Sequence, residues 1–239
     1  SDMIYSTNVT EYDPVLKNNT WGQINTAAES GNIPEMWKVG DEIDLTLSGD
    51  FNETVTLQIW DFNHFDKSDG SGKAGICFGM KNLMKDTKQM NTSGTNTGGW
   101  NNTYMRNTVM NNIYNSMPSE LQNVIKEVNT YANAVNGSTS SSVGLLCKDK
   151  IFIPGNSEVC GCTWSQSTTE SGQTRFPIFT DDSSRKKALP GNSYSSSWWT
   201  RSPYYSNDTT AFCYINSGGI YYYYYNPTQS VGVCFCFNI

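Results

Sequence analysis

The chain has few charged residues, a single histidine and no long apolar segment. Only 16% of its 239 residues are charged, and the acidic residues outnumber the basic ones, giving a formal net charge of −6. An acidic surface attracts neither nucleic acid nor an anionic membrane. No apolar run approaches the roughly 20 residues of a membrane-spanning helix. We therefore expect no nucleic-acid partner and no direct insertion into a membrane.

A signal-peptide pattern and a disulfide framework are also missing. The first three residues resemble a remnant of cloning, so an export signal is left open. An odd number of cysteines cannot pair completely within one chain, and the two Cys-x-Cys pairs lack the spacing and the histidine partners of zinc sites. We predict buried, unpaired thiols and no bound metal, because free cysteine commonly packs as a small hydrophobe. The seven cysteines are Cys77, Cys147, Cys160, Cys162, Cys213, Cys234 and Cys236.

Enough apolar material is present for one folded domain over residues 1–239. Hydrophobic residues make up 37% of the chain and aromatic residues 13%, which is unlike a disordered chain. Apolar periodicity, capping residues and turn signals predict helices over 21–31, 101–117 and 118–134, strands over 41–48, 54–62, 75–80 and 143–154, and long loops over 155–197. Helices in the middle and strands at both ends favour an α+β fold, with two helices on a small twisted antiparallel sheet.

The end of the chain has the composition of a binding surface held by a scaffold. Strand-like sequence at 198–203 and 233–239 brackets an insert, residues 204–229, that is rich in Tyr, Asn, Ser and Thr. Tyrosine offers large contact area with few rotors to freeze, while Ser, Gly and Asn adapt their hydrogen bonds. We therefore predict a scaffold over 1–197 and a ligand-binding region over 198–239. The five consecutive tyrosines at 221–225 also fit a half-buried strand, of which two or three rings would still face outward.

Core residues tolerate substitution poorly, so a binding surface must avoid them. We expect Trp199, Arg201, Phe212, Ile215 and Val231 to lie beneath the surface, and Trp198 and Phe235 to lie in the core. The residues expected to contact ligand on one exposed face are Tyr204, Tyr205, Asn207, Asp208, Thr209, Tyr214, Asn216, Tyr221, Tyr223, Tyr225 and Asn226.

Other polar groups favour structure over catalysis. His64 lies near Asp61 and Asp66, but no nucleophile accompanies it, so we favour a structural histidine in a turn over an acid–base role. The segment 66–72 partly resembles a calcium loop without its regular ligands, and a turn is the preferred interpretation. The charges at 181–187 are most simply a solvated cluster. We predict no catalytic residue and no cofactor.

Several motifs resemble a family of uncharacterised domains found in gut Firmicutes and their phages. They are QIWDFNHFD at 58–66, KSDGSGKAGICFGM at 67–80, TGGWNNTYMR at 97–106, PSELQNVIK at 118–126, WWTRSP at 198–203 and VGVCFCF at 231–237. The resemblance covers nearly the whole chain and implies a C-type-lectin-like fold shared with formylglycine-generating enzymes. In that fold the C-terminal strands and loops form the ligand face. The sequence does not fix the compartment, and we favour a virion or bacterial cell surface.

Members of this group are often the variable proteins of diversity-generating retroelements, which randomise adenines in codons near the end of the gene. Randomising an asparagine codon at its two adenines never produces Lys, Glu, Gln, Met or Trp, and residues 200–228 contain none of these. Residues 128–147 lack them too, and the longer stretch near the end of the chain supports the resemblance. The alternative is a formylglycine-generating-type oxidase. That chemistry needs a reactive cysteine pair, whereas Cys234 and Cys236 lie in sequence typical of a core strand, where thiols are inert.

Overall fold

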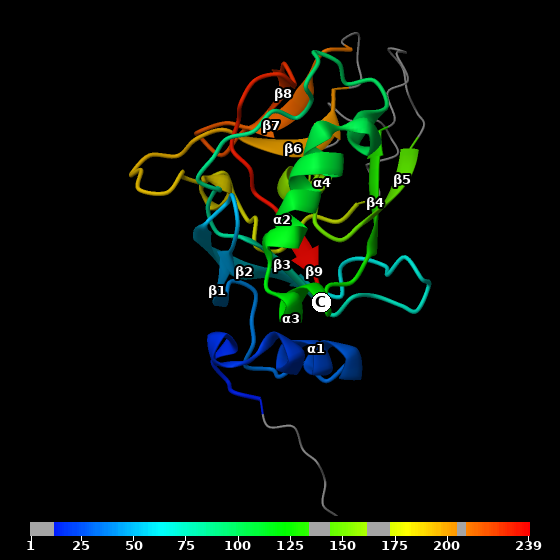
Figure 1. Ribbon diagram of the computed structural model, residues 1–239, viewed down its shortest axis with the longest axis vertical. Coiled ribbons are helices and arrows are strands. Elements are labelled where there is room, and N and C mark those ends of the chain that lie inside the picture. The colour runs from blue at the N-terminus through cyan, green and yellow to red at the C-terminus, as the bar shows by residue number, and fades with distance from the viewer. Residues whose placement is uncertain (1–11, 134–143, 162–172, 205–208) are drawn as a thin grey trace, which may run out of the picture.

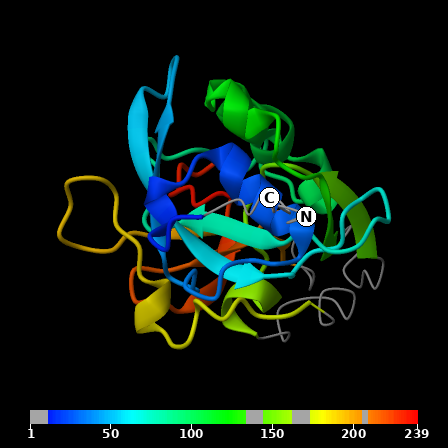
Figure 2. The same cartoon turned by 90° about the horizontal axis from the view of Figure 1, so that it is seen from below.

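The computed structural model describes residues 12–133, 144–161, 173–204 and 209–239, which form a mixed α+β fold with mostly antiparallel sheets and short helices. The side chains of residues 144, 145 and 223 are not described. Figure 1 shows helix α1 at one end of the molecule and the C-terminal three-stranded sheet at the other, and Figure 2 views the molecule from the α1 end. Within the described ranges, no helix has the length and apolarity that crossing a membrane requires.

Helix α1, Trp21–Ser30, follows a short 3-10 turn, Leu16–Asn18, and begins at a capping box. The hydroxyl of Thr20 accepts a hydrogen bond from the Gln23 amide at 3.1 Å, and the Gln23 side chain accepts one from the Thr20 amide at 2.8 Å. The helix ends at Gly31, whose φ of 71° suits glycine. Trp21 packs edge-on against Phe78, which anchors the helix on the central sheet.

The central sheet has the order β1-β2-β3-β9, with β1 at Glu42–Leu47, β2 at Glu53–Phe62, β3 at Ile76–Met80 and β9 at Cys236–Asn238. The predicted hairpin between β1 and β2 and the predicted third strand are confirmed. Gly79 in β3 lies flat against Trp60 of β2, where an added Cβ would come within 2.0 Å of the indole ring. This close approach is why only glycine fits there.

The middle of the chain forms several short elements. The helix predicted over 101–117 is present as a 3-10 turn, Gly99–Asn102, a π-helical turn, Met105–Val109, and helix α2, Met110–Ser116. Helix α3, Ser119–Gln122, is followed by the two-stranded sheet of β4, Val128–Asn133, and β5, Gly144–Asp149. Helix α4, Asn156–Cys160, and a 3-10 turn, Ser183–Arg185, interrupt the predicted loop region.

The predicted helix over 118–134 is wrong. It ends after one turn because the backbone beyond it bonds to distant segments. The Lys126 amide donates to the Asn238 carbonyl at 2.8 Å, and the Asn129 amide donates to the Asp66 carbonyl at 2.9 Å. The apolar residues at 121, 125, 128 and 132 are buried as expected, but in an extended chain rather than on one helix face. Tertiary pairing here overrides a periodicity that resembles a helix.

The C-terminal sheet consists of β6, Trp198–Pro203, β7, Phe212–Ile215, and β8, Tyr221–Tyr225, in the order β6-β7-β8 (Figure 1). Trp198, Trp199 and Phe235 have no exposed surface, which confirms their predicted place in the core. One continuous apolar cluster joins this sheet to the central sheet. The C-terminal region is therefore built onto the main core rather than appended to it.

Candidate functional site

The predicted binding surface lies on the three-stranded sheet β6-β7-β8. Its rings form a row. Trp199 contacts Tyr225 with centroids 5.5 Å apart, Tyr225 contacts Tyr214 at 4.5 Å, and Tyr214 contacts Tyr222 at 6.0 Å. Trp199 is fully buried, whereas Tyr222 keeps 49% of its surface exposed. Burial and the two neighbouring tyrosines raise the pKa of Tyr214. The row therefore runs from the core at Trp199 to solvent at Tyr222.

The predicted alternation of the tyrosine run is wrong. Tyr221, Tyr223 and Tyr225 were expected to face outward, but the most exposed rings are Tyr222 at 49% and Tyr224 at 55%. Tyr221 and Tyr225 are half-buried and pack against the core, and the side chain of Tyr223 lies outside the described part. Tyr222 and Tyr224 thus alternate with Tyr221 and Tyr225, as in a half-buried strand, but with the opposite phase to the one expected.

The scaffold holds the insert, residues 204–229, through hydrogen bonds to the backbone of the insert. The Asn96 side chain is buried, and its Nδ2 donates to the carbonyls of Tyr204 and Ala211, each at 2.9 Å. The Asn96 amide donates to the Thr209 carbonyl at 2.7 Å. These bonds fix both ends of the connection between β6 and β7. They reach only backbone atoms, so they do not depend on which side chains the connection carries.

Two more scaffold residues act in the same way. Gln89 Nε2 donates to the Thr228 carbonyl at 2.8 Å, beyond the end of β8. Arg185 Nε donates to the Gly219 carbonyl at 2.8 Å, in the turn between β7 and β8. Gly219 has a φ of 77°, and an added Cβ would lie 1.8 Å from a neighbouring carbonyl oxygen. This turn position of the insert therefore requires glycine.

Two predicted contact residues also shape the turns that bound β8. Asn216 Oδ1 accepts from the amides of Gly218 at 2.9 Å and Ile220 at 3.1 Å. Asn226 Oδ1 accepts from the amide of Thr228 at 3.0 Å and from its hydroxyl at 2.7 Å. Asparagine commonly closes turns in this way. Their side-chain oxygens therefore have a structural task, which the sequence analysis did not assign to them.

The remaining predicted residues divide into three groups. Thr209 is exposed, and Tyr204 is half-buried at the end of β6. Tyr205, Asn207 and Asp208 lie outside the described residues. The layer expected beneath the surface is confirmed, since all its members are buried: Trp199, Arg201, Phe212, Ile215 and Val231.

The charges at 181–187 are not simply a solvated cluster, because Arg185 and Lys187 are buried at 8% and 2% exposure. Lys187 Nζ donates to the Met80 carbonyl at 2.7 Å and lies 5.5 Å from the centroid of the Trp60 ring. Desolvation lowers the pKa of Lys187. The partners come from β2 and β3, far away in sequence, so local charge patterning gave no sign of them.

The thiols predicted to be buried are so at Cys77, Cys147, Cys213, Cys234 and Cys236. Burial raises the pKa of Cys234 to about 11 and that of Cys236 well above its ordinary value. These thiols are therefore protonated, and hence unreactive, at neutral pH. Cys160 is half-buried, and Cys162 lies outside the described residues. Among the side chains that the structure describes, no three His, Cys, Asp or Glu residues gather as metal ligands.

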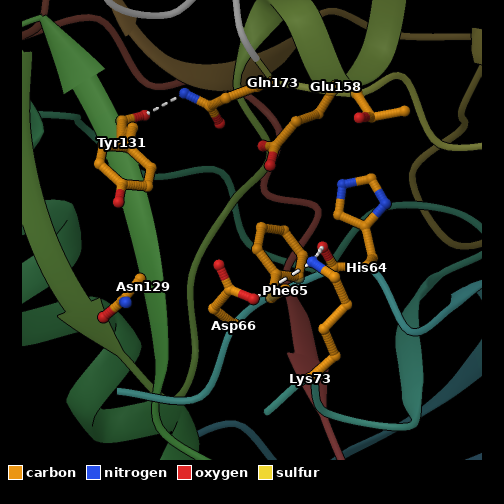
Figure 3. A pocket seen from close by; sticks show the side chains of 9 residues that line it. His64, Phe65, Asp66, Lys73, Asn129, Tyr131, Glu158 and Gln173 are labelled. Carbon is orange, nitrogen blue, oxygen red and sulfur yellow. Dashed lines mark hydrogen bonds and ion pairs between the residues drawn. The ribbon is translucent and has the colours of Figure 1, made fainter. Parts of the chain in front are cut away.

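His64 follows β2 and is well ordered by its neighbours. Its Nδ1 lies 2.7 Å from Asp61 Oδ2, and its ring packs against Phe176 with centroids 4.3 Å apart. Figure 3 shows its imidazole facing a pocket that Glu158 also lines. The predicted turn at 66–72 is confirmed by the bond from the Lys67 amide to the Gly72 carbonyl. The sequence analysis missed the pocket, because Glu158 lies in a region predicted as loop.

The chain matches the family described as "Domain of unknown function (DUF6273)" over residues 74–239 and belongs to that family. The match begins just before β3, so β1 and β2 of the central sheet precede it. No curated protein and no solved structure matches the chain significantly. Membership of this family therefore classifies the domain but assigns no activity to it.

Proposed function

We propose that this DUF6273 protein is a ligand-binding protein with a C-type-lectin-like fold, and that a retroelement diversifies its tyrosine-rich surface. The observation that carries the proposal is a set of hydrogen bonds from scaffold side chains to backbone carbonyls of the insert. The donors are Asn96, Gln89 and Arg185. Hydrogen bonds to backbone carbonyls do not depend on the side chains of the segment that they hold, so such a scaffold tolerates many side chains there. This is what a repeatedly diversified surface requires.

The row of aromatic rings, which is buried at one end and exposed at the other, supports the same function. Trp199 and Tyr225 anchor the row, while Tyr222 and Tyr224 leave about half of their surfaces in solvent. Exposed tyrosine rings can bury a large area on a partner at a low cost in conformational entropy, because they have few rotatable bonds. The partner proposed for this surface is a protein, glycan or small molecule, met at a virion or bacterial cell surface.

We favour binding over the formylglycine-generating-type oxidase. That chemistry needs accessible cysteine thiolates, whereas burial keeps Cys234 and Cys236 protonated. A direct test is to incubate the protein with a cysteine-containing peptide and copper and to analyse the peptide by mass spectrometry. We expect no conversion of cysteine to aldehyde, and conversion would reverse the assignment.

The diversification is tested by sequencing many copies of the gene from one population, together with neighbouring genes. We expect differences concentrated in codons 200–228, with a reverse transcriptase gene and a template repeat nearby. Codons for the buried residues Phe212 and Ile215 and for Gly219 should stay constant. Differences spread evenly along the gene would contradict the proposal.

A further inference from the structure

A pocket lies apart from the tyrosine-rich sheet β6-β7-β8, which we call the tyrosine surface. Some polar groups that line this pocket have no hydrogen-bond partner in the described chain. It lies between the end of β2, strand β4 and helix α4, and has a volume of about 370 Å³ (Figure 3). This volume is within the range of small-molecule sites. The ion pair of Asp66 and Lys73 lies at the pocket with both side chains at least half exposed, whereas Glu158 is 1% exposed.

The carboxylate of Glu158 is held firmly by one of its oxygens only. Oε1 accepts a hydrogen bond from the Gly155 amide at 2.8 Å and pairs with Arg201. The Arg201 side chain also donates to the Ile153 carbonyl at 3.1 Å and to Gln173 Oε1 at 2.7 Å, which fixes the pair. Glu158 Oε2 is buried and has no hydrogen-bond partner. Buried polar atoms are nearly always bonded, so this oxygen awaits a donor from a ligand or a solvent molecule.

Two further acceptors line the same pocket. Asn129 Oδ1 on β4 is buried and has no partner. Asp61 Oδ2 lies 2.7 Å from Nδ1 of His64, so Nε2 is an acceptor in the tautomer that carries its proton on Nδ1, and no hydrogen bond from the described part of the chain engages it. Three elements thus supply three acceptors around one cavity. A complementary ligand must carry several donors.

The charges of the pocket already occur in pairs. Glu158 is balanced by Arg201, and Asp66 lies 3.2 Å from Lys73. A charged ligand would bring a charge without a free counter-charge into a partly desolvated site, which is unfavourable. A neutral ligand avoids that cost. The ring of Phe65 in the wall adds apolar contact surface.

We propose that this pocket binds a neutral polyhydroxy molecule of monosaccharide size. Its hydroxyl groups donate hydrogen bonds to Glu158 Oε2, Asn129 Oδ1 and His64 Nε2, and its C–H faces pack on Phe65. None of these residues belongs to the tyrosine surface, so the pocket is a second site, and its assignment does not rest on the function proposed above.

The test is ligand-observed NMR and calorimetry on the whole protein with the methyl pyranosides of glucose, galactose and mannose. Putrescine and inorganic phosphate serve as charged competitors. We expect at least one pyranoside to bind and neither charged probe to displace it. No binding by any of the three pyranosides at tens of millimolar would overturn the proposal, as would binding of putrescine alone.

Variants locate the binding. Asn129→Leu removes an acceptor that has no partner in the fold, so the variant should fold normally and bind the pyranoside about tenfold more weakly. Asn111→Leu makes the same change on exposed helix α2 and should leave binding unchanged. If Asn129→Leu fails to fold, His64→Phe removes Nε2 while keeping an aromatic ring beside Phe176. Unchanged affinity in the folded pocket variant, or loss of binding in Tyr222→Ser/Tyr224→Ser, would contradict the assignment.

Discussion

The carboxylate of Glu158 and the guanidinium of Arg201 form an ion pair in which both side chains are almost fully buried. Glu158 belongs to helix α4 and Arg201 to β6, so the pair joins the scaffold to the first strand of the C-terminal sheet. Burial removes almost all of the surface of both side chains from solvent. The pair therefore ties the stability of the domain to the strand from which the insert begins.

We predict that Glu158→Gln lowers the free energy of unfolding by roughly 3–5 kcal/mol, because it leaves Arg201 buried without a counter-charge. The matched control is Glu42→Gln, which breaks an exposed pair with Lys81 and should cost only about 0–1 kcal/mol. Guanidinium chloride denaturation measures both. Similar losses in the two variants would show that burial of the Glu158–Arg201 pair does not matter.

The tyrosines of β8 should differ in their effect on stability. Tyr222→Ser/Tyr224→Ser changes two exposed rings and should alter the unfolding free energy by no more than about 0.5 kcal/mol for each ring. Tyr225→Ser removes a half-buried ring that contacts Trp199 and Tyr214, and should cost roughly 1–3 kcal/mol. Thermal denaturation compares them. The surface assignment fails if the double variant is the less stable protein.

Asn96→Leu tests the hydrogen bonds by which the scaffold holds the backbone of the insert. It removes the two hydrogen bonds from Asn96 Nδ2 to the carbonyls of Tyr204 and Ala211, and losing hydrogen bonds in a buried site costs about 1–3 kcal/mol. Asn111→Leu, with the same change on an exposed helix face, should be nearly neutral. Amide hydrogen exchange should show faster exchange in β7 in the Asn96 variant alone. Equal protection of β7 in both variants would contradict the role of Asn96.

Stability should fall in alkali. Cysteine ordinarily ionises at 9.0, and burial raises the pKa of Cys147 and Cys234 to about 11 and moves those of Cys77 and Cys236 upward. Below 9.0 these thiols are protonated in both states and add no pH dependence. Between 9.0 and about 11 only the unfolded chain releases their protons, so folding is penalised as pH rises.

The pKa of Lys187 is lowered, so this group makes folding more favourable as pH rises. Lys187 is a single group, however, and the four thiols together have the larger effect. The denaturant midpoint should therefore be lower near pH 11 than just below pH 9. A midpoint that stays level or rises over this interval would show that the thiols are not buried in solution.

The parts of the fold that the sequence predicted well depend on local chemistry. The β1–β2 hairpin alternates regularly, and α1 carries its own cap and a terminating glycine. The failures depend on distant partners. The strand β4 was predicted as helix because its backbone partners lie elsewhere in the chain, and Lys187 was predicted as solvated because its carbonyl acceptors lie on β3.

The candidate sites follow the same division. Composition alone pointed to the C-terminal region and to the buried layer beneath it, including Phe212 and Ile215. The outward rings could not be identified, because five identical residues in a row give no sign of which alternate set faces the core. The pocket could not be found either, since Glu158 and Arg201 are 43 residues apart and meet only in the folded protein.

Strand β9 completes the central sheet, and its position has a consequence for synthesis of the protein. Phe237 pairs with Phe78, and the Ile239 carbonyl accepts from the amides of Gly75 and Ile76. Until these residues leave the ribosome, one edge of β3 has no strand partner. The insert is made before β9, so an insert that cannot fold hinders the docking of β9 and leaves that edge exposed to proteases and chaperones. We therefore expect the cell to degrade chains whose insert has not folded.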